Sequence, residues 1–112
     1  MVQYSQALDS AFGALADPSR RAIVERLGRG AASVSELAEL LDMTLTGTKK
    51  HTQVLEAAGL VTTDKVGRTR YCRLGPRRLE EELAWIENYR QLLDQRLDRL
   101  GELIEARKGA QQ

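Results

Sequence analysis

An apolar pattern near the C-terminus constrains the fold more than any other feature of the sequence. Between Arg78 and about Arg107, leucine and isoleucine recur at intervals of 4, 3, 7, 4, 3 and 4 residues, and Arg90 occupies the one missing position. This heptad spacing predicts a long helix whose apolar edge packs against a second helix, so the helix needs a partner. The residues on this edge are Leu79, Leu83, Ile86, Leu93, Leu97, Leu100 and Ile104.

The length of 112 residues is enough for one compact domain and too little for a second hydrophobic core. We therefore expect a single domain over residues 1–112. The composition is 42% hydrophobic and 29% charged, which is typical of a folded chain. Only 4% of the residues are aromatic, so the core is expected to consist of leucine, valine, isoleucine and alanine.

Three short helices are expected in the N-terminal part of the chain. Residues 4–15 place apolar side chains at intervals of 4, 3 and 3, which is typical of one helix face. Asp17 and Pro18 provide an N-cap and a proline at the first position of a second helix. Ser33 and Glu36 have the spacing of a capping box and predict the start of a third helix.

Residues 44–60 predict a fourth helix with two unlike halves. Thr44 can cap its start, and Gly59 can end it in a Schellman motif in which Leu60 packs back onto Leu55. The first half is rich in threonine and also carries two lysines and a histidine. The residues expected on the buried side are Leu45, Val54, Leu55 and Leu60.

A β-hairpin is expected after this helix. The β-prone runs 61–65 and 69–73 flank Gly67, which lies where a tight turn needs a glycine. Helices followed by a hairpin are the element order of a mainly α fold, the winged helix-turn-helix. In that fold the third and fourth helices form the DNA-reading unit and the hairpin forms the wing.

The charge is distributed unevenly along the chain. Residues 44–73 hold six basic and two acidic residues, a net charge of +4, whereas residues 1–43 hold four basic and six acidic residues, a net charge of −2. The whole chain is only +1, so the basic segment stands out as a surface for a polyanion. The candidate DNA contacts are Thr44, Thr46, Thr48, Lys49, Lys50, His51 and Gln53 on the fourth helix, and Arg68 and Arg70 at the hairpin turn.

Each candidate has a structural alternative. Lysine pairs are common on solvated helix faces, and His51 also suits a packed structural histidine. Arginines such as Arg68 and Arg70 are also common on any exposed hairpin. Gly47 either lets the backbone approach DNA or has no role.

Other classes of function lack their signals in this sequence. The single cysteine, Cys72, cannot form a disulfide within the chain, and neither a signal peptide nor an apolar run of about 20 residues is present. We expect a cytoplasmic protein with no membrane role. The only histidine, His51, lies on a basic helix and is a poor general base, so we expect no enzyme activity and no cofactor.

The segments FGALADPSRRAIVERL (12–27), SVSELA (33–38) and KHTQVLEAAGLV (50–61) resemble the ArsR family of bacterial transcriptional repressors. The resemblance extends from about residue 8 to 104. It implies a homodimeric winged helix repressor in which the first and last helices pair between subunits and the fourth helix enters the major groove of a palindromic operator. The dimer interface it implies consists of Leu8, Phe12, Leu83, Ile86, Leu93, Leu97, Leu100 and Ile104.

The chain departs from the family pattern at several positions. Many members sense metals through cysteines on the third helix or histidines on the last, and this chain has neither there, so we expect no metal at those sites. Thr48 and Thr52 stand where the family usually has apolar residues, which leaves space-filling as an alternative to base contact. The alternatives for function are a protein-interaction module without DNA function, and a redox- or metal-responsive repressor that uses Cys72. The small-molecule effector and the operator sequence are not specified by the sequence.

Overall fold

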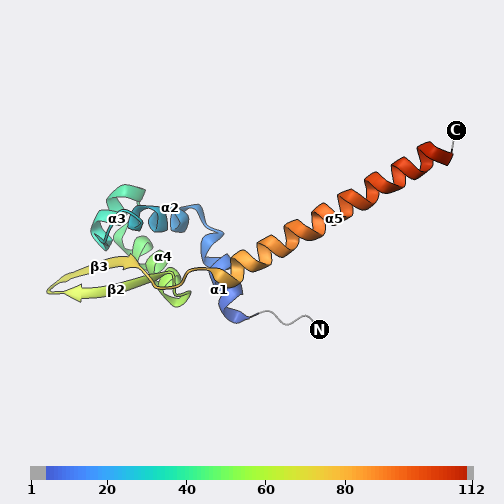
Figure 1. Ribbon diagram of the computed structural model, residues 1–112. Helices are drawn as coiled ribbons and strands as arrows, with labels where there is room; N and C mark the ends of the chain where they lie inside the picture. Colours follow the sequence, from blue (N-terminus) through green and yellow to red (C-terminus); the bar gives the residue numbers. More distant parts are fainter. Residues whose placement is uncertain (1–4, 111–112) are drawn as a thin grey trace. The chain divides into compact units, whose positions relative to one another are not determined.

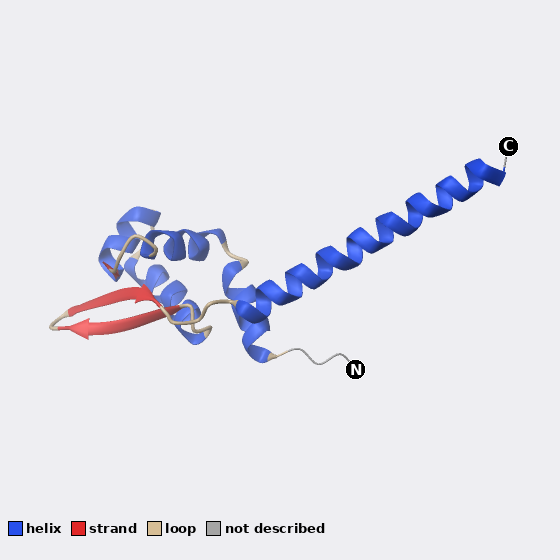
Figure 2. Cartoon of the chain, viewed as in Figure 1, coloured by secondary structure: helices blue, strands red, loops and turns tan. Residues whose placement is uncertain are grey.

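The computed structural model describes residues 5–110 and divides into two compact units, residues 1–79 and 80–112 (Figures 1 and 2). The first unit contains four helices and a small sheet, and the second is one long helix. The expected first helical residue, Tyr4, lies outside the described residues. In chain order the elements are α1 (Gln6–Leu15), α2 (Pro18–Leu27), β1 (Ala32–Ser33), α3 (Val34–Leu41), α4 (Leu45–Ala57), β2 (Val61–Val66), β3 (Thr69–Leu74) and α5 (Glu80–Ala110).

Three helices begin where the sequence predicts a cap. Asp17, Ser33 and Thr44 are the N-caps of α2, α3 and α4. Each side chain accepts hydrogen bonds from backbone N–H groups two or three residues later, at 2.8 to 3.1 Å. These bonds satisfy donors that have no partner within the helix, which fixes where each helix starts.

The end of α4 confirms the predicted Schellman motif. Gly59 has a φ of +78°, its N–H donates to the carbonyl of Glu56 at 2.9 Å, and the N–H of Leu60 donates to the carbonyl of Leu55 at 3.0 Å. Leu55 and Leu60 are both members of the buried core. The motif therefore turns the chain sharply from α4 into the hairpin.

The sheet is antiparallel and has the strand order β1-β3-β2. Val66 pairs with Thr69, so the hairpin loop is the two residues Gly67 and Arg68, and Gly67 has a φ of +64° as such a turn requires. The hairpin projects beyond the helices of its unit in Figure 1. The remaining strand of the sheet, β1, was not predicted, because its two residues are too few to show an alternating pattern.

The core of the first unit is aliphatic, as the composition predicts. It lies between α2, α3, α4 and the base of the hairpin, and Ile23, Leu37, Leu55 and Cys72 are fully buried in it. Thr48 is also fully buried.

The long C-terminal helix forms as the heptad pattern predicts. It begins at Glu80, two residues later than expected, because Leu79 just before it has a φ of +58°. The apolar edge is exposed along the helix; Leu83, for example, is 65% exposed. Trp85 and Tyr89 stack with ring centroids 6.0 Å apart. Within residues 5–110, no helix combines the length and the apolar character needed to cross a bilayer.

Candidate nucleic-acid interface

The inward side of α4 is built on threonines. Thr48, Thr52 and Leu55, spaced i, i+4 and i+7, are 0%, 3% and 0% exposed. The hydroxyl of Thr48 donates to the carbonyl of Thr44 at 2.9 Å, and that of Thr52 to the carbonyl of Lys49 at 2.8 Å. The hydroxyls are thus satisfied by their own helix, while the rest of each side chain fills the interior. The prediction that Thr48 contacts DNA is wrong, because its side chain has no accessible surface.

Two apolar residues of α4 are exposed, contrary to prediction. Leu45 is 45% exposed because it lies in the first turn of the helix, where it lines a surface groove instead of the core. Val54 is 42% exposed because it lies about 100° around the helix from Leu55. The threonines therefore occupy the buried positions that these two residues were expected to fill.

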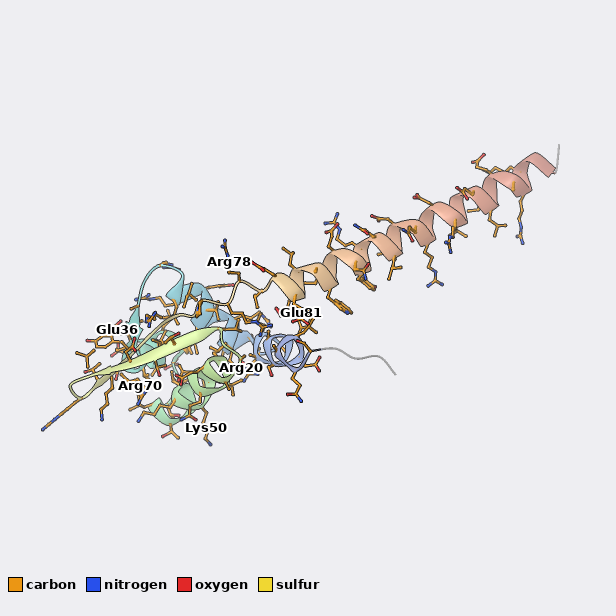
Figure 3. The ribbon with its side chains drawn as sticks, turned by 60° about the horizontal axis from the view of Figure 1, so that its bottom comes forward. Arg20, Glu36, Lys50, Arg70, Arg78 and Glu81 are labelled. Carbon is orange, nitrogen blue, oxygen red and sulfur yellow. The ribbon has the colours of Figure 1, made fainter. Side chains whose placement is uncertain are left out.

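The outward side of α4 carries four of the residues predicted to contact DNA. Thr46, Lys49, Lys50 and Gln53 are all exposed and follow the spacing i, i+3, i+4 and i+7, which forms one continuous stripe. The side chain of Lys50 points outward from the helix in Figure 3. Thr44, just before the helix, is exposed but uses its hydroxyl oxygen to cap the N–H of Gly47. The stripe presents the side-chain types that bind base edges and phosphates.

His51 is half-buried and is held by a neighbouring arginine. Its Nδ1 lies 3.3 Å from Nη1 of Arg20. A guanidinium only donates, so Nδ1 is the acceptor in a hydrogen bond between these two groups. His51 therefore has a structural contact, and its contact with DNA stays a prediction.

Arg20, the arginine that contacts His51, lies in the first turn of α2 and connects it to the end of α1. Arg20 donates to the carbonyls of Ala14 at 2.7 Å and Gly13 at 3.2 Å, at the end of α1. The backbone N–H of Arg20, and then that of Ser19, binds the carboxylate of Asp17 and lowers its pKa. Sequence reasoning missed this role, although an arginine directly after a capped helix start lies within reach of the preceding helix end.

The hairpin presents a basic inner face. Lys65 pairs with Arg70, and both lie on the same face of the ribbon as the buried residues Val61 and Cys72, because side chains alternate along a strand. Arg68 is exposed at the turn. Lys65 was not among the predicted contacts. It could have been assigned to this face, because it lies two residues after Thr63 and four after Val61, and every second side chain of a strand lies on the same face.

A groove of about 330 Å³ separates this inner face from α3 and α4. It is lined by the start of α3, the first turns of α4 and the tip of the hairpin. The lining residues are Ser33, Val34, Ser35, Leu45, Lys49, Lys65, Arg68, Thr69 and Arg70.

A chain of hydrogen bonds ties the hairpin to α4, the helix predicted to read DNA. Nη1 of Arg70 donates to the hydroxyl of Thr63 at 3.0 Å, and that hydroxyl donates to the Glu56 carboxylate at 2.5 Å. Figure 3 shows Arg70 on the hairpin. Glu56 and Thr63 were not predicted as site residues, since their role appears only when helix and strands are packed together.

Cys72 lies in the core and not on the surface. It is fully buried on β3, opposite Ala32 of β1, and burial, followed by the charge of Glu56, raises the pKa of its thiol. A protonated and shielded thiol reacts poorly with oxidants, which disfavours the redox alternative. Within residues 5–110, no group of three or more His, Cys, Asp or Glu side chains is arranged to hold a metal ion.

The predicted dimer residues differ in how much exposed surface they offer. Leu8 is 6% exposed and Phe12 is half-buried, so little of either is available to a second chain. The remaining predicted residues on α5 are all exposed and stay predictions: Leu83, Ile86, Leu93, Leu97, Leu100 and Ile104.

Comparisons with known proteins point in the same direction as this geometry. Residues 15–64 match a helix-turn-helix domain family. The HTH-type transcriptional regulator Rv2034 of Mycobacterium tuberculosis (strain ATCC 25618 / H37Rv) is 38% identical over 94 residues, which cover 77% of this chain and 88% of that protein. The transcriptional repressor SdpR of Bacillus subtilis (strain 168) is 24% identical over 82 residues, which cover 73% of this chain and 91% of that protein.

A solved structure is similar over nearly its whole length. The crystal structure of the ArsR family transcriptional regulator RHA00566 superimposes with a TM-score of 0.74 at 42% identity, and the match covers 84% of this chain and 97% of the other. Similarity at this level, together with a helix-turn-helix unit and a hairpin wing, shows the family. The chain belongs to the ArsR family of winged helix-turn-helix, DNA-binding transcriptional regulators.

Proposed function

We propose that the chain is a repressor that binds a palindromic operator as a homodimer, with α4 of each subunit in a major groove. The observation that carries this proposal is the division of α4 into two faces. Its inward stripe of Thr48, Thr52 and Leu55 anchors the helix in the core, so the opposite stripe is presented rigidly. A two-fold symmetric dimer then places its two α4 helices about 34 to 36 Å apart, one turn of DNA.

The exposed edge of α5 supports dimerisation. The helix has 31 residues and spans about 46 Å at about 1.5 Å per residue. Large apolar side chains stay exposed along it at heptad spacing, and a patch of this kind marks a protein contact. A second copy of α5 has the same spacing and covers the edge.

The proposal has three further parts. The protein represses transcription, it acts by binding DNA and not by catalysis, and it lies in the cytoplasm. A dimer on an operator excludes other proteins from the same DNA, and the relative SdpR is named a repressor. Nδ1 of the single histidine, His51, lies against Arg20, which makes it unsuited to move a proton in catalysis. The chromosomal DNA of a bacterium lies in the cytoplasm, so we place the protein there.

Replacing both lysines of the outward stripe tests the proposal. The DNA is an operator selected from random fragments by binding to the unmodified protein. Lys49→Ala with Lys50→Ala is expected to weaken binding to this operator strongly at moderate salt, because two cations near the phosphates are removed. A variant with Arg107→Ala and Lys108→Ala, at the end of α5, removes the same charge and serves as the control. Equal retention of the DNA band by both variants in a gel-shift assay would refute the proposal.

A further inference from the structure

The groove between α4 and the hairpin is walled by cations from two elements. Lys49 comes from α4, and Lys65, Arg68 and Arg70 come from the hairpin. The remaining lining residues are uncharged, and Ser33, Ser35 and Thr69 among them carry hydroxyls. Four positive charges therefore face one small volume from opposite sides.

The cations on the two faces of the hairpin differ in whether a carboxylate pairs with them. On the outer face, Nε of Arg73 lies 3.0 Å from the carboxylate of Asp64, so that charge is neutralised within the hairpin. None of the four groove cations forms an ion pair with a carboxylate among residues 5–110. The carboxylate of Glu56 reaches Arg70 only through the hydroxyl of Thr63 and does not line the groove, so the groove keeps an excess of positive charge that an anion offsets.

The wall of the groove is held in place by the hydrogen bonds from Arg70 through Thr63 to Glu56. Because Glu56 belongs to α4 and the other two residues to β2 and β3, this chain fixes the wing against the recognition helix. Lys49, Glu56, Thr63 and Arg70 also line a second hollow. The guanidinium of Arg70 is therefore positioned at the groove before any ligand arrives.

We propose that this groove binds one phosphate group, and that on DNA this group is a backbone phosphodiester held jointly by the recognition helix and the wing. The proposal rests on the DNA-binding function of the family and names one contact within it. Lys49 and Lys65 then act on the same phosphate. Lys50 lies about 100° around α4 from Lys49 and does not line the groove, so it acts on a different part of the DNA.

Two pairs of variants separate a shared phosphate from independent ones. The slope of log K against log salt depends on the number of phosphates that the protein neutralises, and it falls by about 1 for each phosphate that is no longer neutralised. Lys49→Ala with Lys65→Ala is therefore expected to lower the slope by at most about 1, because Arg68 and Arg70 remain at the groove, whereas two independent phosphates would lower it by about 2. The effects of the two substitutions on affinity should be coupled by at least about threefold. Lys50→Ala with Lys65→Ala, the matched control, is expected to lower the slope by about 1 with additive effects, because Lys49 still neutralises the shared phosphate.

The results distinguish this inference from the function on which it rests. If the unmodified protein binds no DNA fragment, the proposed function fails. If it binds and the Lys49 and Lys65 substitutions are additive, like those of Lys50 and Lys65, the shared phosphate is refuted while DNA binding stands.

A second experiment identifies the source of the phosphate. In a series of operators, each carrying one uncharged methylphosphonate, one position per half-site should abolish the effect of Lys65→Ala on affinity. If no position does so, while inorganic phosphate gives saturable NMR shifts at Ser35 and Thr69 of the free protein, the groove serves a free anion and the assignment to DNA is overturned.

Thr63→Val, which changes no charge, should weaken DNA binding severalfold; unchanged affinity would refute the positioning of Arg70.

Discussion

Replacing Thr48 by valine removes a buried hydroxyl from α4 and keeps the shape of the side chain. The hydroxyl donates to the carbonyl of Thr44 at 2.9 Å, and the same carbonyl also accepts from the backbone N–H of Thr48 at 3.0 Å. The carbonyl therefore keeps a partner in the variant. Removing the hydroxyl bond costs about 1 kcal/mol, and removing a polar group from an apolar interior returns a similar amount.

The free energy of unfolding of Thr48→Val is accordingly expected to stay within about 1 kcal/mol of the unmodified protein. Thr48→Ser keeps the hydroxyl and removes the buried methyl, which costs about 1 kcal/mol or more once the cavity is included. Neither substitution is expected to change operator affinity, because the side chain has no accessible surface. Urea unfolding and fluorescence anisotropy with a labelled operator measure the two quantities.

Gln53→Ala provides the matched comparison from the exposed stripe. It should leave stability nearly unchanged and weaken operator binding by about 1–3 kcal/mol, if the amide contacts a base. The reasoning about α4 is refuted if Thr48→Val binds the operator more weakly at unchanged stability while Thr48→Ser binds it as before. That pattern would show that the hydroxyl itself contacts DNA.

Three further variants probe other parts of the fold. Leu93→Asp with Leu97→Asp should convert a dimer into a monomer in sedimentation velocity, because charges enter the apolar edge of α5; a persistent dimer would contradict the pairing. Gly59→Ala should lower the free energy of unfolding by about 1–2 kcal/mol, since φ is +78° there, and an unchanged urea midpoint would argue against the Schellman motif. The pKa of Asp17 is lowered from 3.8 on folding, chiefly by the N–H of Arg20, so its stabilising effect is full above that value and disappears as the pH falls through the lower folded pKa. The gap in urea midpoint between the unmodified protein and Asp17→Ala should therefore narrow below about pH 4, and a gap of constant width would refute the role of the charge.

Local sequence signals predicted most of the fold. Caps at Asp17, Ser33 and Thr44, the glycine at 59 and the heptads of α5 each act within a few residues, so they are visible in a single sequence. The buried side of α4 was assigned partly wrongly, because hydrophobicity alone ranks leucine and valine above threonine. A threonine whose hydroxyl bonds to its own helix behaves as an apolar residue, and that bond is seen only in the structure.

Contacts that join distant segments account for what the sequence did not show. The bond between Arg20 and His51 spans 31 residues, and the path from Glu56 to Arg70 crosses three elements. Lys65 could have been found from strand alternation once the inner face of the hairpin was known. The polar residues of the exposed stripe of α4 were correctly predicted to face outward, because none of them fills a position in the core.

Crosslinking from the outward stripe to DNA tests whether a dimer places one α4 in each half-site of the operator. A photoreactive residue at Gln53, with the same residue at Arg107 as the control, is bound to the operator and the crosslinked bases are mapped. We expect two groups of crosslinks in the major groove, related by two-fold symmetry and about 10 to 10.5 base pairs apart, from position 53 only. A single group, or equal crosslinking from position 107, would contradict a dimer that places one α4 in each half-site.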